Sequence, residues 1–374
     1  MEDIEHLLEW AQTEGVTLDG ITPNYLTGRG IGLVAKRQLK PDEVVLKVPL
    51  KHLRTLGNTP SEITKALHGA SVHAILAVSL CLETSPHFDA WRAVLPSRQD
   101  LTSSMPICWP EPLQKLLPPT AQALLAAQQV KFNKDWARVA ASYPDMSKAD
   151  FLYSWLLVNT RCFFHTTKET EKLHRHDHMV LQPVADLLNH SPEGYCVGNF
   201  GSDFFTITTT RDHAAGEEIF IRYGTHAGDA LLVEYGFSPA SATNRWDETC
   251  LDRYLCPRFK APQKAKLEEV GFWGKYMLDA ETACYRTHVA IRMLVLPEDL
   301  WWAVLDGARD EDEDQALVNK ELLRVLRDYE KDLLSTLAAV DKLEAGTEEM
   351  RDSLRERWLQ VGDLIVKAIS KLQA

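Results

Sequence analysis

The stretch LQPVADLLNHSP, residues 181–192, is the part of the sequence that most narrows the fold. Its apolar run carries one carboxylate, Asp186, and predicts a short helix that breaks off at Asn189 and His190 before a Ser-Pro turn. A helix that only packs in a core has no need of an amide beside an imidazole. Three explanations stay open from these residues alone: a helix cap with a turn, a corner of a metal site, or the wall of a binding site.

Composition predicts a folded protein of two domains. The chain has 374 residues with 45% apolar content, which is enough for two cores at roughly 100–200 residues per domain. Its 41 basic and 53 acidic residues give a formal charge of -12, which argues against a nucleic-acid partner and favours a cationic one. The seven cysteines lie far apart without a CxxC pair, so we expect reduced thiols rather than disulfides or a zinc site.

The amino-terminal sequence MEDIEHLLEW is acidic, whereas a signal peptide would begin with basic residues. No stretch approaches the ~18 consecutive apolar residues that a membrane span needs. We therefore expect a monomeric protein of the cytoplasm or nucleus that does not contact a membrane.

Two predicted β-hairpins flank a helical middle. Residues 28–50 read as two short strands around a Lys-Pro-Asp turn, and residues 204–221 repeat that design. Between the hairpins, residues about 61–165 show helical periodicity. The sequence therefore predicts a β scaffold that is interrupted by a helical insertion.

The two ends of the chain are predicted to be helical. An amphipathic helix opens the chain within residues 1–19, and long amphipathic helices replace the strands after about residue 245. We expect three parts: this N-terminal helix, a β region with its insertion over residues 20–240, and an all-α domain over residues 241–374. The fold class is therefore α+β.

Gly28, Gly30 and Gly32 form a GxGxG pattern that resembles a dinucleotide-binding loop. That interpretation requires a strand before the loop and a helix after it, whereas the polar run PNYLT precedes the loop and a strand follows. Two explanations remain open: an ordinary tight turn, or a loop whose backbone approaches a ligand closely because glycine lacks Cβ.

Two further stretches contain residue types that serve in metal binding or catalysis. The histidine-rich run HRHDH, residues 174–178, invites a metal interpretation, but its mixed charge favours a solvated loop. The run IFIRYGTHAGDALLVEYGF, residues 219–237, predicts a strand that ends near Tyr223 and a short helix that ends near Tyr235. A tyrosine at a strand end is ordinarily a core or rim aromatic. No GxSxG, P-loop or HExxH motif occurs, so hydrolase, kinase and zincin functions lack support.

Taken in order, the glycine loop, the helical insert, ADLLNHSP, the second hairpin and IRYG…YGF resemble the SET-domain methyltransferases. They are most similar to the branch that includes the plant Rubisco large-subunit lysine methyltransferase. The resemblance spans nearly the whole chain. It implies a SET-type β fold with a helical insertion and an all-α C-terminal domain that binds the substrate.

The resemblance places the cofactor, S-adenosylmethionine, against the glycine loop, the end of the insert and the Asn-His pair. The cofactor-binding residues that it implies are Gly30, Gly32, Leu33, Arg161, Asp186, Asn189, His190 and Tyr223. Arg161 is expected to hold a cofactor carboxylate. Tyr223 is the implied catalytic residue, and the implied substrate-binding residues are Phe163, Tyr235 and Phe237. No metal is implied.

The chemistry of methyl transfer suits this small set of polar groups. Transfer from a sulfonium is a direct in-line displacement, so the enzyme must supply alignment, exclusion of water and a neutral amine. A free lysine has a pKa of ~10.4 and is charged at pH 7, so the pocket must favour its neutral form by desolvation and by the nearby sulfonium charge. Alignment alone can contribute several kcal/mol, within the ~7 to 11 attributed to proximity and orientation.

Two departures from the family pattern bear on the substrate and the cofactor wall. The chain lacks the cysteine-rich zinc segment that many SET proteins carry after the core, which weighs against a typical histone methyltransferase. Gln182-Pro183-Val184 stands where relatives often have a longer hydrophobic run. We therefore expect S-adenosylmethionine-dependent methylation of lysine in a non-histone protein, with the substrate recognised by the C-terminal helical domain.

Two alternatives stay open. The first is histidine methylation, although the apolar Phe163 favours lysine as the acceptor. The second is a catalytically silent SET-type scaffold, against which the intact Tyr223, Asn189 and His190 count.

Overall fold

A computed structural model describes residues 2–239 and 243–373, and the chain forms two compact units. The first unit comprises Met1–Thr102 and Ala127–Thr225, and the second comprises Ser103–Ala126 and His226–Ala374. The boundary expected at residues 240 and 241 lies outside the described residues. Residues 103–126, which were expected inside the helical insertion, group instead with the second unit.

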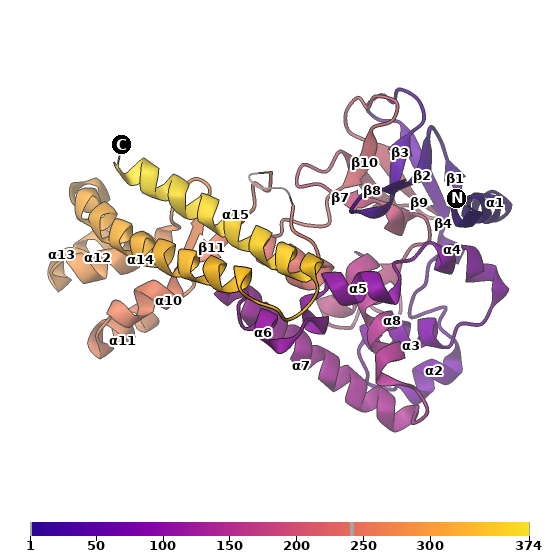
Figure 1. Ribbon diagram of the computed structural model, residues 1–374, viewed down its shortest axis with the longest axis horizontal. Helices are drawn as coiled ribbons and strands as arrows, with labels where there is room; N and C mark the ends of the chain where they lie inside the picture. Colours follow the sequence, from indigo (N-terminus) through magenta and orange to yellow (C-terminus); the bar gives the residue numbers. More distant parts are fainter. Residues whose placement is uncertain (1, 240–242, 374) are drawn as a thin grey trace. The chain divides into compact units, whose positions relative to one another are not determined.

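The first unit is built around an eight-stranded sheet with the order β1-β4-β9-β8-β10-β3-β2, in which β7 also pairs with β10 (Figure 1). The strands are β1 Thr17–Leu18, β2 Ile21–Leu26, β3 Gly30–Ala35, β4 Val44–Pro49, β7 Asn189–His190, β8 Cys196–Phe200, β9 Phe204–Thr209 and β10 Glu218–Ile221. A separate pair is formed by β5 Cys162–Phe164 and β6 Met179–Leu181. Both expected hairpin regions are strands, so the predicted β scaffold is confirmed.

The strand β2 was not expected, because PNYLT is polar. In the structure it pairs antiparallel with β3, with Pro23 opposite Leu33. Since β2 lies at the end of the sheet order, polar side chains can face solvent and a proline costs no ladder hydrogen bond. The glycine pattern is therefore a β-hairpin turn, and the exclusion of a dinucleotide-binding loop holds because a strand follows it.

The helices before β5 pack beside this sheet or in the second unit. They are α1 Glu2–Thr13, α2 Ser61–Ala66, α3 Val72–Cys81, α4 Asp89–Ala93, α5 Arg98–Ser104, α6 Glu111–Gln114, α7 Pro119–Ser142 and α8 Lys148–Arg161. Residues 72–79 of α3 are all buried, as expected for a helix that is apolar on every side. Helices α3 and α8 pack against each other and form the centre of the insertion.

The second unit is mainly helical. After α9 Gly228–Ala230 its helices are α10 Asp252–Leu255, α11 Ala261–Glu269, α12 Tyr285–Val295, α13 Glu298–Leu305, α14 Gln315–Asp341 and α15 Glu348–Gln373. Helices α14 and α15 lie side by side (Figure 1), and the predicted stripes on them form its core, including Leu322, Val325, Leu354 and Val361. A two-stranded sheet, β11 Glu248–Cys250 with β12 Met277–Asp279, corrects the expectation of an all-α region. Three-residue strands are too short to produce a period-2 pattern.

One buried ion cluster ties α15 to the start of the segment that carries Tyr235. The Arg357 side chain is fully buried, and its guanidinium lies 2.6 Å from Asp229 and 2.7 Å from Asp247. Burial acts to lower the pKa of Arg357, but the two carboxylates raise it above its ordinary value. A Cβ on Gly228 would collide with this guanidinium, so only glycine fits there.

All seven cysteines are free thiols in the structure. Among the helices of the described ranges, none combines the length and apolar character needed to cross a bilayer.

A histidine is buried in the centre of the insertion. The His73 ring stacks on Trp155 with centroids 4.2 Å apart, and its Nε2 lies 2.8 Å from the Trp155 carbonyl oxygen. Its Nδ1 lies 2.9 Å from Nζ of Lys131. Burial, with help from the Lys131 charge, lowers the pKa of His73 well below its ordinary value of 6.5.

This burial predicts an acid-sensitive fold. Below the ordinary histidine pKa of 6.5 the unfolded chain binds a proton at this position that the folded chain does not, so the free energy of unfolding falls as pH falls. We expect His73→Gln to reduce the slope of unfolding free energy against pH between about pH 6.5 and 5. Denaturant titrations at several pH values measure this slope. The same change at the exposed His176 should leave it unaltered, and equal slopes for wild type and His73→Gln would contradict the assignment.

Candidate active site

The stretch LQPVADLLNHSP, residues 181–192, does not form the expected helix. After β6 ends at Leu181, residues Ala185–Leu187 make a single 3-10 turn, η5, and Asn189–His190 form strand β7. The turn ends at Leu187 and its C-cap residue is Leu188, so neither Asn189 nor His190 caps it. Each residue of the pair lies opposite a residue of β10, Phe220 and Ile221 respectively, in parallel register.

The turn before the pair is strained. Val184 has φ 72° and ψ −47°, a conformation that β-branched residues rarely adopt and that costs about 1–3 kcal/mol. Two residues earlier, Gln182 is fully buried, and neither its amide nitrogen nor its amide oxygen has a hydrogen-bond partner among the described residues. Such strain persists only where the surrounding structure over-determines it. The segment that departs from the family pattern is thus held rigidly, together with the residues that follow it.

Asp186, on η5, anchors the end of the insertion. Its fully buried side chain accepts from Trp91 Nε1 at 3.1 Å, and Arg161 Nη1 donates to the Asp186 carbonyl oxygen at 2.6 Å. Burial raises the pKa of Asp186, and Arg161 and Trp91 act against that rise. Arg161 Nε is buried without a hydrogen-bond partner in the described part of the chain. The predicted Arg161 and Asp186 are therefore neighbours. Trp91, which the sequence did not single out, also binds Asp186.

Asn189 is positioned by Glu218, the first residue of β10. The Asn189 amide Nδ2 donates to Glu218 Oε1 at 2.8 Å, and the other oxygen of Glu218 lies 2.6 Å from Arg29 in the glycine turn. A Cβ on Gly32 would lie 2.8 Å from both Asn189 Nδ2 and Glu218 Oε1, so Gly32 allows this approach. Sequence reasoning missed Glu218 and Arg29. The available signal was a charged residue at the start of the otherwise apolar strand Glu218–Ile221.

His190 and Tyr223 form the second half of the site. The Tyr223 backbone N–H donates to His190 Nδ1 at 3.1 Å, and the two rings lie 5.2 Å apart. The Tyr223 hydroxyl donates to the Leu188 carbonyl oxygen at 2.8 Å. A phenol oxygen also carries acceptor lone pairs. A tyrosine whose O–H donates a hydrogen bond to a carbonyl can therefore still accept one from an approaching N–H group.

Gly28 and Gly30 lie on the exposed surface of the hairpin between β2 and β3. Gly28 and Gly30 have φ of 73° and 70°, and a Cβ at either position would meet no atom within 4 Å. Leu33 is fully buried on β3, between Ile219 of β10 and Pro23 of β2.

The predicted substrate-binding aromatics fall in different units. Phe163, on β5 of the first unit, packs edge-on against Phe205 with ring centroids 5.5 Å apart. Tyr235 and Phe237 belong to the second unit, where Tyr235 closes a π-helical turn, Leu231–Tyr235, that ends at Gly236 in the left-handed conformation. The Tyr235 hydroxyl lies 3.5 Å from His226 Nε2. A π-helical turn is rare and is often found at functional sites.

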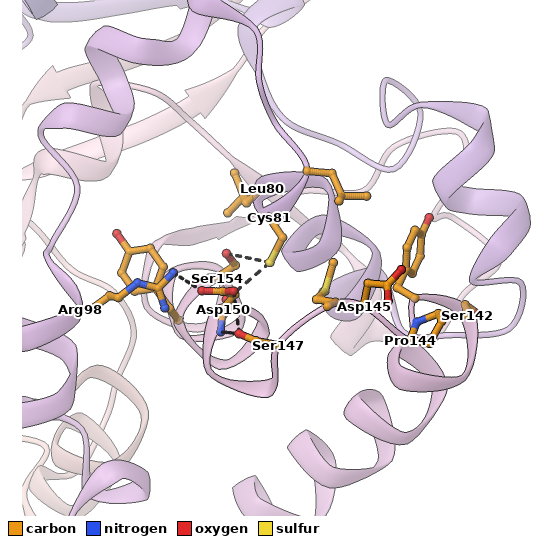
Figure 2. A pocket seen from close by; sticks show the side chains of 13 residues that line it. Leu80, Cys81, Arg98, Ser142, Pro144, Asp145, Ser147, Asp150 and Ser154 are labelled. Atoms are coloured by element: carbon orange, nitrogen blue, oxygen red, sulfur yellow. Dashed lines mark hydrogen bonds and ion pairs between the residues drawn. The ribbon is translucent and has the colours of Figure 1, made fainter.

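Two other features do not belong to this site. A hollow of about 650 Å³ in the insertion is lined by residues such as Cys81, Arg98 and Asp150, with none of the predicted site residues among them (Figure 2). Burial raises the pKa of the Cys81 thiol, which makes it a poor nucleophile. In the HRHDH run, His174 and His176 are exposed, as expected for a solvated loop.

Comparison with known families identifies the fold. The SET domain family matches residues 30–224, just over half of the 374 residues, so the chain belongs to the SET-domain family. The family described as ribosomal lysine N-methyltransferase 2 C-terminal domain matches residues 251–371. The expected SET-domain methyltransferase, with S-adenosylmethionine as its cofactor, is thereby confirmed.

Individual relatives agree with this assignment. The chain is 27% identical over 360 residues to ribosomal lysine N-methyltransferase set11 of Schizosaccharomyces pombe, covering 88% of this chain and 89% of that protein. It is 26% identical to the actin-histidine N-methyltransferase of Gallus gallus, over 62% of this chain and 42% of that protein. Its fold is similar to the crystal structure of the SET domain of LSMT bound to MeLysine and AdoHcy, with a TM-score of 0.67 at 15% identity over 99% of this chain and 91% of that one.

The close approach at Gly32 makes a sharp test of the cofactor wall. We expect Gly32→Ala to weaken S-adenosylmethionine binding by at least about 5-fold, because its Cβ would displace the ends of the Leu26, Asn189 and Glu218 side chains and overpacking costs about 1–3 kcal/mol. Calorimetric titration measures the dissociation constant, and a melting curve without ligand reports the fold.

Gly216→Ala is the matched control, because Gly216 lies in the turn before β10, outside the predicted cofactor-binding residues, and its Cβ would meet no described atom within 4 Å. Its left-handed φ makes the change strained, so this control reports the effect of lost stability alone on cofactor binding. If both variants bound the cofactor equally well, Gly32 would not control the wall.

Proposed function

We propose that the protein is an S-adenosylmethionine-dependent protein-lysine N-methyltransferase that acts on a non-histone substrate. One observation carries the proposal: the hydroxyl of Tyr223 is committed as a donor to the Leu188 carbonyl, beside the Asn189–His190 pair. An amine directed at this hydroxyl finds an acceptor that carries no negative charge. The absence of a cysteine-rich zinc segment after the core supports a non-histone substrate.

The residues present fit the cofactor. The exposed Gly28 and Gly30 present no side chain to it, and the buried Nε of Arg161, which has no hydrogen-bond partner among the described residues, offers a donor for its carboxylate. Asn189 would contact it through an amide that Glu218 holds in place. When bound, the cofactor supplies an electrophilic methyl group on a sulfonium. The chain's own contribution is to hold that group and the acceptor nitrogen in line.

Tyr223 would act by orientation rather than by accepting a proton in a formal base step. Its hydroxyl oxygen accepts from the neutral amine and directs the nitrogen lone pair toward the methyl group. Loss of the proton from the lysine ammonium is favoured by desolvation in the pocket and by the positive sulfonium. Aromatic rings such as Phe163 would stabilise the cationic product and exclude water.

Histidine methylation is the second candidate, because an actin-histidine N-methyltransferase is among the similar proteins. An imidazole acceptor calls for a polar partner deep in the pocket. Phe163 instead packs against Phe205, which favours the aliphatic stem of lysine. A catalytically silent scaffold is the third, and it predicts no cofactor binding.

The second unit is the proposed substrate-recognition region. Its match to the C-terminal domain of a ribosomal lysine N-methyltransferase supports this role, and the chain's net charge of -12 favours a basic protein as substrate. Along the chain, the proposed division is an N-terminal helix within residues 1–19, a SET region over residues 20–240 and a recognition region over residues 241–374, which is the larger part of the second unit. We also propose that the protein acts as a monomer in the cytoplasm or nucleus and needs neither nucleic acid nor a membrane.

The mechanism predicts a large effect of removing one hydroxyl group. Tyr223→Phe should lower kcat about 100-fold or more, because the acceptor that orients the amine is lost. The dissociation constant of S-adenosylmethionine should change little. Labelled cofactor with an extract of cells that lack the enzyme measures transfer, and mass spectrometry of the labelled protein identifies the modified residue.

Tyr143→Phe, which removes the hydroxyl of a half-buried tyrosine at the hollow outside the site, serves as the control and should leave kcat unchanged. Unimpaired transfer by a folded Tyr223→Phe enzyme would refute the mechanism. A label on histidine would establish the second candidate, and absence of both transfer and cofactor binding would establish the scaffold.

A further inference from the structure

A cluster of two histidines and one glutamate lies outside the methyl-transfer site, in the first unit. Glu14 follows α1, His52 ends the 3-10 turn Leu50–His52 after β4, and His87 lies in the 3-10 turn Pro86–Phe88 before α4. One ligand atom from each residue lies within 4.8 Å of the other two. Three segments that are distant in sequence therefore bring metal-ligating atoms to one place.

The distances are close to those of a coordination shell. His52 Nε2 lies 3.4 Å from one carboxylate oxygen of Glu14, and His87 Nδ1 lies 3.6 Å from the other. A tetrahedral ion with bonds of about 2.0–2.1 Å requires roughly 3.3 Å between ligand atoms. Small side-chain rotations would therefore close the shell around an ion.

The surroundings are dry on one side. His52 is buried, and Trp10 packs edge-on against both imidazoles, with ring centroids 5.7 Å from His52 and 5.8 Å from His87. The indole nitrogen of Trp10 is itself buried and has no hydrogen-bond partner in the described ranges. Among the described residues, Lys51 is the one lysine or arginine paired with this carboxylate, with Nζ 3.9 Å from Glu14, and its side chain is 68% exposed and can swing away.

We propose that Glu14, His52 and His87 form a site for a divalent transition metal, with Zn²⁺ as the ion that this donor set fits best. Two neutral imidazoles and one carboxylate are a common set of protein ligands for Zn²⁺, which leaves a fourth position for water. The ion would join the end of α1 to the sheet and to the segment that leads into α4. This role is structural and is independent of the methyl-transfer chemistry.

The competing explanation is a metal-free ion-pair cluster. In that cluster a ring N–H of His52 donates to Glu14, and His87 lies against a carboxylate oxygen of Glu14 at 3.6 Å. The donor, His52 Nε2, lies 2.9 Å from the Glu14 carbonyl oxygen. To bind an ion, Nε2 must exchange this hydrogen bond for the metal while Nδ1 keeps the ring proton.

Metal titration of the full-length, tag-free protein tests the proposal. Protein stripped with a chelator and dialysed should take up one Zn²⁺ in competition with a chromophoric chelator, and its melting temperature should rise on binding. Co²⁺ in place of Zn²⁺ should produce the visible absorption of a four-coordinate ion.

Two variants keep the test decisive. His87→Ala removes a half-buried ligand and should lower the affinity for Zn²⁺ by more than ~10-fold without unfolding the chain. His52→Ala should do the same, but it also removes a buried ring. His176→Ala removes an exposed histidine and should change neither affinity nor melting temperature.

If stripped protein takes up no Zn²⁺ and shows no Co²⁺ absorption, the cluster is an ion-pair network and the proposal is wrong. Binding that survives His87→Ala but is lost in a variant of the HRHDH run would place the metal elsewhere and would overturn the proposal equally. These measurements do not depend on methyl transfer, so their outcome is separate from that of the proposed function.

Discussion

The hydrogen bond from the Asn189 amide to Glu218 is the interaction on which the candidate site depends. It joins β7 to β10 at the point where the glycine turn comes closest, and Gly32 exists there because any Cβ would enter this contact. Glu218 also holds Arg29, so one carboxylate fixes both the cofactor-facing amide and the turn opposite it. The same strand, β10, leads directly to Tyr223, whose backbone N–H holds His190. A single strand thus sets the positions of Asn189 and of Tyr223.

The structure maintains this arrangement at some energetic cost. Val184 is held in a left-handed conformation and Asp186 is buried, and each is stabilised by its surroundings rather than by local preference. In the second unit, the buried ion pairs of Arg357 similarly hold the segment that leads to Tyr235 against α15. Breaking such a buried pair by removing one partner costs about 3–5 kcal/mol. Each unit therefore contains a buried ion pair that holds one of these segments.

The sequence was sufficient for the architecture, and the predicted Arg161 and Asp186 lie together, as do His190 and Tyr223, but the prediction failed where the signal was short or distant. Long stripes such as that on α14 and the alternating strand β4 were found because periodicity over many residues is strong. The β11–β12 pair was missed because three-residue strands carry no period. The helix expected before Asn189 is a single 3-10 turn, because an apolar run of this length does not distinguish a buried turn from a helix. Glu218 and the Glu14–His52–His87 cluster were missed because their partners lie far away along the chain.

A crystal structure of the full-length protein with S-adenosylhomocysteine, the product of methyl transfer, tests the central claim most directly. The account predicts the product at the junction of β3, β7 and β10, in contact with the backbone from Gly30 to Leu33 and with Asn189 and His190. It also predicts that the Asn189–Glu218 hydrogen bond persists and that the sulfur lies on the side of Tyr223. Electron density for the product elsewhere, or an Asn189 side chain turned away from Glu218 in the complex, would contradict the account.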